Sequence, residues 1–184
     1  MIHFVLGGAR SGKSRFAEQL TLNIAQQQKL QPVYIATATV LDDEMSQRIA
    51  KHQQDRDEQW QLIECPLTLS EKLTQLAPNS IYLVDCLTLW LNNQLYNIEQ
   101  TCNGYKQKQQ QLQLAVDNLL FALASAEADI VLVSNEVGFG IVPLGETSRL
   151  FADYCGWLNQ GVAALAQQVT LVTAGIPLKI KHED

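Results

Sequence analysis

Short apolar runs alternate with longer amphipathic segments along most of this chain. The segment after the first run, for example, carries Phe16, Ala17, Leu20 and Ile24 at helical spacing. The pattern predicts strands over 2–6, 32–37, 60–65, 80–87, 129–134 and 169–174, and helices over 13–27, 42–56, 69–77, 86–96, 105–126 and 147–168. Strands that alternate with helices indicate right-handed βαβ units, so we expect an α/β fold whose mostly parallel central sheet is flanked by helices.

The domain organisation that this pattern favours is a single domain over residues 1–184. No linker rich in Gly, Ser or Pro and no internal repeat divides the chain. A length of 184 residues is enough for one sizeable core. We expect a surface loop over 97–104, between two of the predicted helices.

Composition and charge narrow the function classes. The formal net charge is −6, which disfavours a general binder of nucleic acids or of acidic membranes but leaves room for a local basic pocket. Cys65, Cys86, Cys102 and Cys155 show no metal or redox spacing, so we expect reduced and mostly buried thiols. No signal-peptide pattern and no apolar run of membrane-spanning length occurs, and the expected location is the cytoplasm.

One local motif carries specific chemistry. Residues 7–14 match G-x-x-x-x-G-K-[ST], with a strand predicted before them and a helix after them. The glycines let backbone N–H groups surround an anion, and the helix N-terminus adds positive potential. In such a loop Lys13 reaches the β- and γ-phosphates of a nucleotide, and the Ser14 hydroxyl binds Mg²⁺. The alternative, a glycine turn followed by a surface lysine, is disfavoured because both the motif and its flanks are complete.

A carboxylate at the end of another buried strand complements this loop. Asp85 ends the run IYLVD, where a P-loop protein places an acid that holds Mg²⁺ directly or through water. The alternative role is an N-cap for the helix that follows, and both roles are compatible. Nothing in these residues identifies the base of the nucleotide, because no N-K-x-D stretch occurs.

A histidine between two arginines forms a second candidate element. Arg48, His52 and Arg56 have i, i+4, i+8 spacing and share one face of the predicted helix. Two guanidinium groups disfavour protonation of the imidazole, which would keep it neutral and able to attack phosphorus. From spacing alone, however, a solvated polar helix face is the favoured interpretation.

Several stretches together resemble a known family. GGARSGKSRFAE, YIATATVLDDEMSQRIAKHQQDR, LVDCLTLWLNN, VSNEVGFGIVP, GWLNQ and GIPLKIK occur in this order over nearly the whole chain. They are similar to the bifunctional adenosylcobinamide kinase / adenosylcobinamide-phosphate guanylyltransferases of cobalamin biosynthesis. The P-loop is shared by many families, whereas R-I-x-x-H at 48–52 and N-E-V-G-x-G-I-V-P at 135–143 are far more specific. The stretches 94–110 and 144–149 depart from the family pattern.

The resemblance implies a two-step activity. Members phosphorylate adenosylcobinamide and then transfer GMP from GTP to the new phosphate through a guanylylated histidine, which corresponds to His52. The family resemblance outweighs the interpretation of His52 as a solvent-exposed residue without a functional role. The resemblance also implies a RecA-like fold, a trimer, GTP or ATP with Mg²⁺, and adenosylcobinamide and its phosphate as substrates. The implied nucleotide contacts are Gly7, Gly8, Ala9, Arg10, Ser11, Gly12, Lys13, Ser14, Ala36, Thr37, Ala38, Gln53, Gln54, Asp55, Arg56, Glu64 and Asp85.

Two other functions are compatible with the residues. A simple P-loop kinase for a small metabolite would transfer the γ-phosphate and would use His52 only structurally. A RecA-like module gated by a nucleotide would hydrolyse slowly and would bind a protein partner. Asn135 and Glu136 follow a buried strand, where they either touch substrate or cap a turn. Asn159, in an apolar helix, either bonds across an interface or faces water.

Overall fold

Seven strands and five helices make up the fold in a computed structural model that describes residues 1–39 and 59–182. The strands are β1 Ile2–Gly7, β2 Gln31–Ala36, β3 Gln61–Glu64, β4 Ser80–Asp85, β5 Asp129–Asn135, β6 Gln168–Thr173 and β7 Ile176–His182. The helices are α1 Lys13–Gln28, α3 Leu69–Leu73, α4 Leu87–Thr101, α5 Tyr105–Ala124 and α6 Glu146–Leu165.

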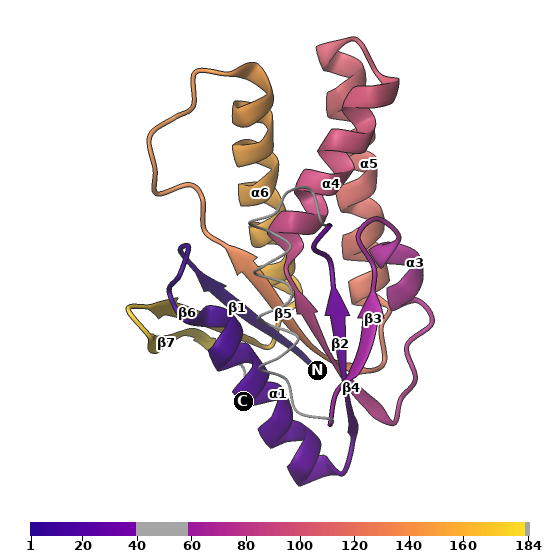
Figure 1. The fold of residues 1–184 in the computed structure, drawn as a ribbon, viewed down its shortest axis with the longest axis vertical. Helices are drawn as coiled ribbons and strands as arrows, with labels where there is room; N and C mark the ends of the chain where they lie inside the picture. Colours follow the sequence, from indigo (N-terminus) through magenta and orange to yellow (C-terminus); the bar gives the residue numbers. More distant parts are fainter. Residues whose placement is uncertain (40–58, 183–184) are drawn as a thin grey trace.

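All seven strands belong to one sheet, in the order β3-β2-β4-β5-β1-β6-β7 (Figure 1). Every neighbouring pair from β3 to β6 is parallel, and β7 alone runs antiparallel to its neighbour β6. The α/β fold class, with a mostly parallel sheet flanked by helices, is therefore confirmed. One strand, β5, separates β1 from β4, so the glycine-rich loop and Asp85 emerge two strands apart at the same edge of the sheet.

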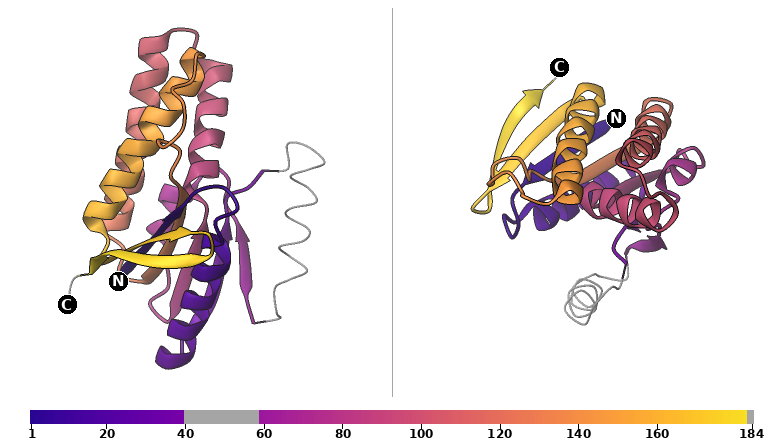
Figure 2. Two further views of the ribbon diagram at one scale, coloured as in Figure 1. Left: turned by 90° about the vertical axis from the view of Figure 1, so that its left-hand side faces the viewer. Right: turned by 90° about the horizontal axis from the view of Figure 1, so that it is seen from above.

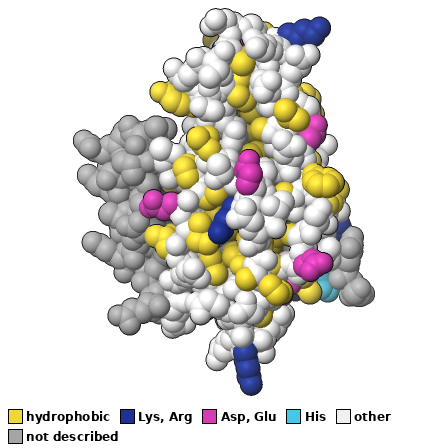
Figure 3. Space-filling model, turned by 90° about the vertical axis from the view of Figure 1, so that its right-hand side faces the viewer, with side chains coloured by type: hydrophobic (Ala, Val, Ile, Leu, Met, Phe, Trp, Pro, Cys, Tyr) yellow, Lys and Arg dark blue, Asp and Glu magenta, His cyan; other side chains and the backbone are white. Residues whose placement is uncertain are grey.

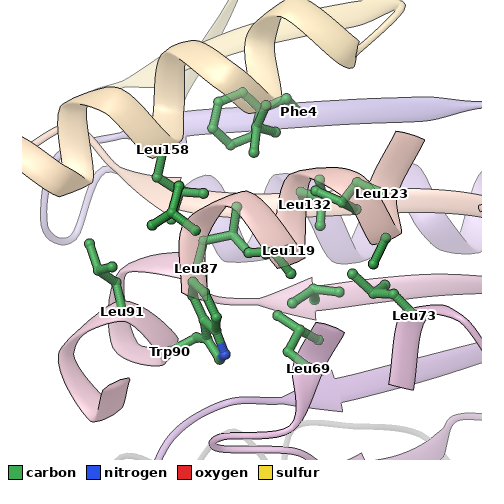
Figure 4. Close-up of a cluster of buried hydrophobic side chains, with 14 of the residues drawn as sticks. Phe4, Leu69, Leu73, Leu87, Trp90, Leu91, Leu119, Leu123, Leu132 and Leu158 are labelled. Atoms are coloured by element: carbon green, nitrogen blue, oxygen red, sulfur yellow. The ribbon is translucent and has the colours of Figure 1, made fainter. Parts of the chain in front are cut away.

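The two faces of the sheet are covered by different helices. On one face Ala17 and Ala25 of α1 pack with Val5, Leu83 and Val131 of the central strands. On the other face α4, α5 and α6 form the larger core, and they extend well beyond the sheet (Figure 2). This core includes Phe4, Leu87, Trp90, Leu119 and Leu158, which Figure 4 shows among one cluster of buried side chains.

Two expectations about local structure are wrong. Residues 97–101 belong to α4 and do not form a loop, because Ile98 continues the buried stripe of that helix. The last strand was expected at 169–174, but a second strand, β7, follows it after a tight turn. Ile176, Leu178 and Ile180 recur at every second position, with Lys179 between the last two and Lys181 after them, and this alternation is a usable strand signal.

The four cysteines are free and buried, as expected. Within the described part of the chain, no helix combines the length and apolar character that a bilayer crossing requires.

Candidate functional site

The glycine-rich loop joins β1 to α1 and curls back on itself. Arg10 and Gly12 adopt positive φ values of 56° and 93°, which turns the backbone toward the start of the helix. Ser11 N donates to the carbonyl oxygen of Gly8 at 3.3 Å. Such alternation of backbone conformation forms a nest of N–H groups that accepts an anion. The loop therefore has a backbone conformation of the kind that binds anions; phosphate binding by residues 7–14 stays a prediction.

Gly7 is required by close packing under this loop. A Cβ atom there would lie 2.4 Å from Ser11 Oγ and 2.5 Å from the Val172 carbonyl oxygen. Gly8 is different, because a Cβ atom at that position would meet nothing within 4 Å. The two adjacent glycines thus have separate reasons to be present, and only the first is fixed by its neighbours.

Lys13 lies beneath the loop with its side chain 8% exposed. Its Nζ donates to the Gly8 carbonyl oxygen at 3.0 Å. Burial lowers the pKa of Lys13, while the nearby Cys86 and Asp85 oppose this shift. A partly desolvated ammonium group gains strongly from anionic phosphate oxygens, so the site is suited to a polyphosphate.

Predicted nucleotide-binding residues lie at the carboxyl ends of four strands, β1 to β4, at one edge of the sheet. Ala36 pairs in register with Asp85 on one side and with Glu64 on the other. Gly7 pairs with Asn135. Ligands of open α/β sheets bind at the carboxyl ends of parallel strands, which is where all these residues lie.

Asp85 is oriented by a residue of the neighbouring strand. Tyr34 donates its hydroxyl hydrogen to Asp85 Oδ2 at 3.0 Å. The alternation of β4 directs Asp85 to the α1 face, on which Leu83 and Ile81 also lie. The Asp85 carboxylate is close enough to Lys13 for its negative charge to raise the pKa of the ammonium group. This proximity agrees with a role for Asp85 beside the phosphate groups.

Thr37 is fully buried, and its side chain is used within the protein. Its Oγ1 donates to the Cys86 carbonyl oxygen at 2.7 Å and accepts from the Cys86 N–H at 2.7 Å. Asn93 of α4 donates to the carbonyl oxygens of Thr37 and Pro66, at 2.8 and 3.1 Å. These bonds fix the ends of β2, β3 and β4 relative to one another. The Thr37 N–H is also used within the protein, because it donates to the Asp85 carbonyl oxygen at 3.2 Å. Only the second lone pair of the Thr37 carbonyl oxygen is left for a ligand.

Cys86 follows Asp85 and is not a candidate nucleophile. Burial, reinforced by the charge of Asp85, raises the pKa of its thiol to about 12. The thiol therefore stays protonated at physiological pH, and the thiolate is the reactive form.

The remaining predicted contacts differ in accessibility. Gly8, Ala9, Arg10 and Glu64 are exposed at the loop and at the strand edge, and Ser14, Ala36 and Ala38 are half-buried. The other predicted residues, Arg48, His52, Gln53, Gln54, Asp55 and Arg56, lie outside the described residues.

Oxygen ligands for a metal ion are available only in small number. Among residues 1–39 and 59–182, no group of three or more His, Cys, Asp or Glu side chains could hold a metal ion. Mg²⁺ needs only one or two protein oxygens when phosphate oxygens and water complete its shell. The Ser14 hydroxyl and the Asp85 carboxylate are ligands of that kind, so the residues fit magnesium bound with a nucleotide.

Charged side chains elsewhere on the visible surface are scattered. Figure 3 shows a face on which lysine and arginine side chains stand singly among uncharged atoms. This face adds no cationic patch to the anion-binding loop.

Sequence reasoning missed several residues that shape the site. Gly175, in the turn between β6 and β7, donates its N–H to the Ser11 carbonyl oxygen at 2.8 Å. Tyr34 and Asn93 have the bonds described above. Asn159 is buried and donates from Nδ2 to the Asn135 carbonyl oxygen at 3.1 Å, so neither exposure to water nor an interface accounts for it. The sequence does single out Asn159, as a polar residue in an apolar helix, but it does not reveal the bond to Asn135.

Comparisons with known proteins identify the family of this chain. A family model described as cobinamide kinase / cobinamide phosphate guanyltransferase matches residues 3–180. The bifunctional adenosylcobalamin biosynthesis protein CobP of Pseudomonas aeruginosa is 44% identical over 184 residues, covering 100% of this chain and 99% of its own. Two proteins named bifunctional adenosylcobalamin biosynthesis protein CobU, from Escherichia coli and Salmonella typhimurium, are each 40% identical and cover 98% of this chain and 100% of their own.

A solved structure, the flagellar accessory protein FlaH of Methanocaldococcus jannaschii, matches with a TM-score of 0.49 and 11% identity, over 99% of this chain and 78% of its own. That likeness is too weak to bear on function. The family match and the full-length relatives are decisive, and the chain belongs to the cobinamide kinase / cobinamide phosphate guanyltransferase family of bifunctional enzymes.

Proposed function

We propose that residues 1–184 form one domain that catalyses two consecutive steps of adenosylcobalamin biosynthesis. The first phosphorylates adenosylcobinamide with GTP or ATP. The second transfers GMP from GTP to adenosylcobinamide phosphate, giving adenosylcobinamide-GDP and pyrophosphate. The observation that carries the proposal is the buried Lys13 in its glycine-rich loop beside Asp85, in a chain whose full-length relatives have the bifunctional name.

In the kinase step the loop and Lys13 stabilise the triphosphate. The backbone N–H groups of residues 8–14 and the Lys13 ammonium offset the negative charge that develops on the transferred phosphoryl group and on the leaving diphosphate. Ser14 and Asp85 would hold Mg²⁺, whose charge neutralises the phosphate oxygens. Because phosphoryl transfer needs mainly positioning and electrostatic stabilisation, these groups supply most of what the step requires.

In the guanylyl step His52 is the nucleophile. A nitrogen of its imidazole forms a bond with the α-phosphorus of GTP, the bond to the bridging oxygen breaks, and its electron pair leaves with pyrophosphate. The phosphate of adenosylcobinamide phosphate then attacks the same phosphorus and releases the imidazole. Arg48 and Arg56 favour the neutral imidazole that this attack requires. β2, which precedes the segment with His52 in the sequence, ends at the same edge of the sheet as the P-loop.

Further nucleotide contacts are proposed around these groups. Ala36, Ala38 and the backbone of Thr37 would contact the nucleotide after β2, and Glu64 would contact it at the end of β3. Gln53, Gln54, Asp55 and Arg56 would contribute from the segment that contains His52. The register that places Ala36 between Asp85 and Glu64 supports the first group.

We also propose that the chain forms a trimer in the cytoplasm. Its edge strand β7 exposes Ile176, Leu178 and Ile180, each more than half exposed, which favours a partner at that edge. The four free buried cysteines suit a reducing compartment. Sedimentation of the purified chain would test the oligomeric state, and a monomer at micromolar concentration would contradict it.

The covalent intermediate offers the sharpest test of this function. The wild type, incubated with GTP radiolabelled at the α-phosphate, should acquire a label that is acid-labile and alkali-stable, as expected of a phosphoramidate. His52→Ala should lose the label, whereas His182→Ala, at an exposed position in the last strand, should keep it. Equal labelling of wild type and His52→Ala would overturn the guanylyl-histidine step.

A comparison of Lys13→Ala with His52→Ala distinguishes loss of triphosphate binding by the glycine-rich loop from loss of the nucleophile. Lys13→Ala should lose most of both activities, because the glycine-rich loop and Lys13 bind the triphosphate in each step. His52→Ala should lose only GMP transfer. Retention of either activity in Lys13→Ala would contradict the proposal that both steps use the same triphosphate-binding loop.

A further inference from the structure

The end of β5 contains a polar side chain that the mechanism above does not use. Asn135 lies opposite Gly7 in the register of β1 and β5. Val131 and Val133 precede it on the α1 side of the sheet, so alternation directs the Asn135 side chain to the face on which Asp85 also lies. It therefore lies between the strand of the P-loop and the strand of Asp85, at the edge of the sheet where the glycine-rich loop begins.

The backbone of Asn135 is held from two helices. Its N–H donates to Thr88 Oγ1 of α4 at 2.7 Å. Its carbonyl oxygen accepts from Asn159 Nδ2 of α6 at 3.1 Å and from Cys155 Sγ at 3.6 Å. Thr88 is itself bonded to Ser134 at 3.1 Å, so this network fixes the strand end with little freedom.

The side-chain oxygen of Asn135 contrasts with this satisfied backbone. Asn135 Oδ1 is buried and has no hydrogen-bond partner among the described residues. Asn159, which is 5% exposed, likewise has a buried Oδ1 with no hydrogen-bond partner among the described residues. Buried polar atoms are nearly always bonded, and an exception needs an explanation. An acceptor held rigidly without a donor indicates a donor that arrives with the substrates.

The chemistry of the ligand restricts what that donor can be. Phosphate oxygens are acceptors and cannot bond to an amide oxygen. An O–H group can, and the reaction supplies two: the alcohol that is phosphorylated and water bound to the metal of the nucleotide. We propose that Asn135 binds such an O–H group through Oδ1 and positions it for phosphoryl transfer. This inference rests on the kinase activity in the proposed function.

For the alcohol, the geometry has a direct consequence. When its O–H bond points at Asn135 Oδ1, the lone pairs of the alcohol oxygen are free to face the γ-phosphorus. That oxygen forms the new P–O bond, and the bond from the γ-phosphorus to the bridging oxygen breaks. Its electron pair stays with the nucleoside diphosphate, and the alcohol proton passes to solvent. Asn135 orients the group and takes no proton.

The test uses an apolar variant of similar shape, Asn135→Leu, with Asn135→Ala as a second variant and Asn118→Ala, at an exposed position on α5, as control. Removal of an acceptor that has no partner within residues 1–39 and 59–182 should leave the melting temperature of the full chain unchanged or higher. Loss of the O–H contact should lower kcat for cobinamide phosphorylation about tenfold or more, with GTP affinity within about twofold. A purely structural role would instead lower the ligand-free melting temperature.

Two further measurements identify the source of the O–H group. Unchanged GTP hydrolysis without cobinamide and an unchanged Mg²⁺ requirement, with slower phosphorylation, assign it to the alcohol. Slower hydrolysis with a higher Mg²⁺ requirement assigns it to metal-bound water. Phosphorylation within twofold of wild type in both variants overturns the inference. A loss of activity that is fully explained by a lower melting temperature overturns it as well. Failure of the proposed function would instead appear in the wild type, as absent phosphorylation, or in the His52 labelling.

Discussion

The N–H of Gly175 donates a hydrogen bond of 2.8 Å to the carbonyl oxygen of Ser11, and so joins the last β-hairpin to the glycine-rich loop. The hairpin turn consists of Ala174 and Gly175, with φ values of 50° and 78°. Positive φ at both central residues is typical of a type I′ turn between antiparallel strands. The Gly175 Cα would also lie 3.3 Å from a Cβ atom placed on Gly12, so the turn limits the space around the loop.

Gly175→Ala should therefore affect both stability and nucleotide binding. A non-glycine residue at this positive φ costs about 1 kcal/mol in the free energy of unfolding. Because strain at the turn alters the bond to Ser11, we expect weaker GTP binding as well. Chemical denaturation and calorimetric titration with GTP would measure the two effects.

Gly104→Ala is the matched control for this prediction. Gly104 has a φ of −101° before α5, and a Cβ atom there would meet nothing within 4 Å. It should leave GTP affinity unchanged. If Gly175→Ala binds GTP as tightly as Gly104→Ala, the hairpin turn does not support the loop.

Gly7 and Gly8 should respond very differently to alanine. In Gly7→Ala the new methyl group would overlap Ser11 Oγ and the carbonyl oxygen of Val172, so the loop must move. Overpacking of this kind costs about 1–3 kcal/mol, and we expect GTP affinity to fall about tenfold or more. Gly8→Ala meets open space, and its affinity should stay within about threefold of wild type. Similar losses in both variants would show that crowding at Gly7 is not the cause.

The parts of the site that were predicted from sequence are those with local signals. The P-loop occupies eight consecutive residues, so its strand, glycines and lysine could be recognised together. The bond from Gly175 to Ser11 and the bonds from Asn93 to Thr37 and Pro66 join segments far apart in the chain. Their geometry depends on strand order and register, which local periodicity does not specify.

The edge of the sheet illustrates the same limit. β7 alternates clearly, but a parallel α/β pattern gives no reason to add an antiparallel strand after β6. The α4 boundary was missed for a different reason. Asn97, Glu99, Gln100 and Thr101 are polar, and the helix continues through them because Ile98 is buried in the core and Glu99 is bonded to Lys108 and Thr147.

Asn93→Ala should be strongly destabilising. The side chain is 8% exposed and donates to two carbonyl oxygens, at the ends of β2 and β3. Its loss leaves both acceptors without this donor, so we expect the free energy of unfolding to fall by about 2–3 kcal/mol. Asn92→Ala, at the exposed neighbouring position of the same helix, should change it by about 0.5 kcal/mol or less. Denaturation curves with equal slopes would make the two values comparable, and equal stability of the variants would contradict the role of Asn93.

The pH dependence of stability should reveal the cost of burying Lys13. Burial lowers its pKa in the folded protein from the ordinary value of 10.5, against the opposing influence of Cys86 and Asp85. Between the lowered value and 10.5 the unfolded chain binds more protons, so this group makes stability rise with pH in that window; below it the full cost of burial remains. Lys13→Met should remove this rise and should leave the ligand-free protein at least as stable as wild type near pH 7, although it no longer binds GTP tightly. Lys106→Met, at an exposed position on α5, should keep the rise. Denaturation curves measured from neutral to alkaline pH would decide the matter, since an identical pH dependence in Lys13→Met and wild type would show that the ammonium group is not desolvated.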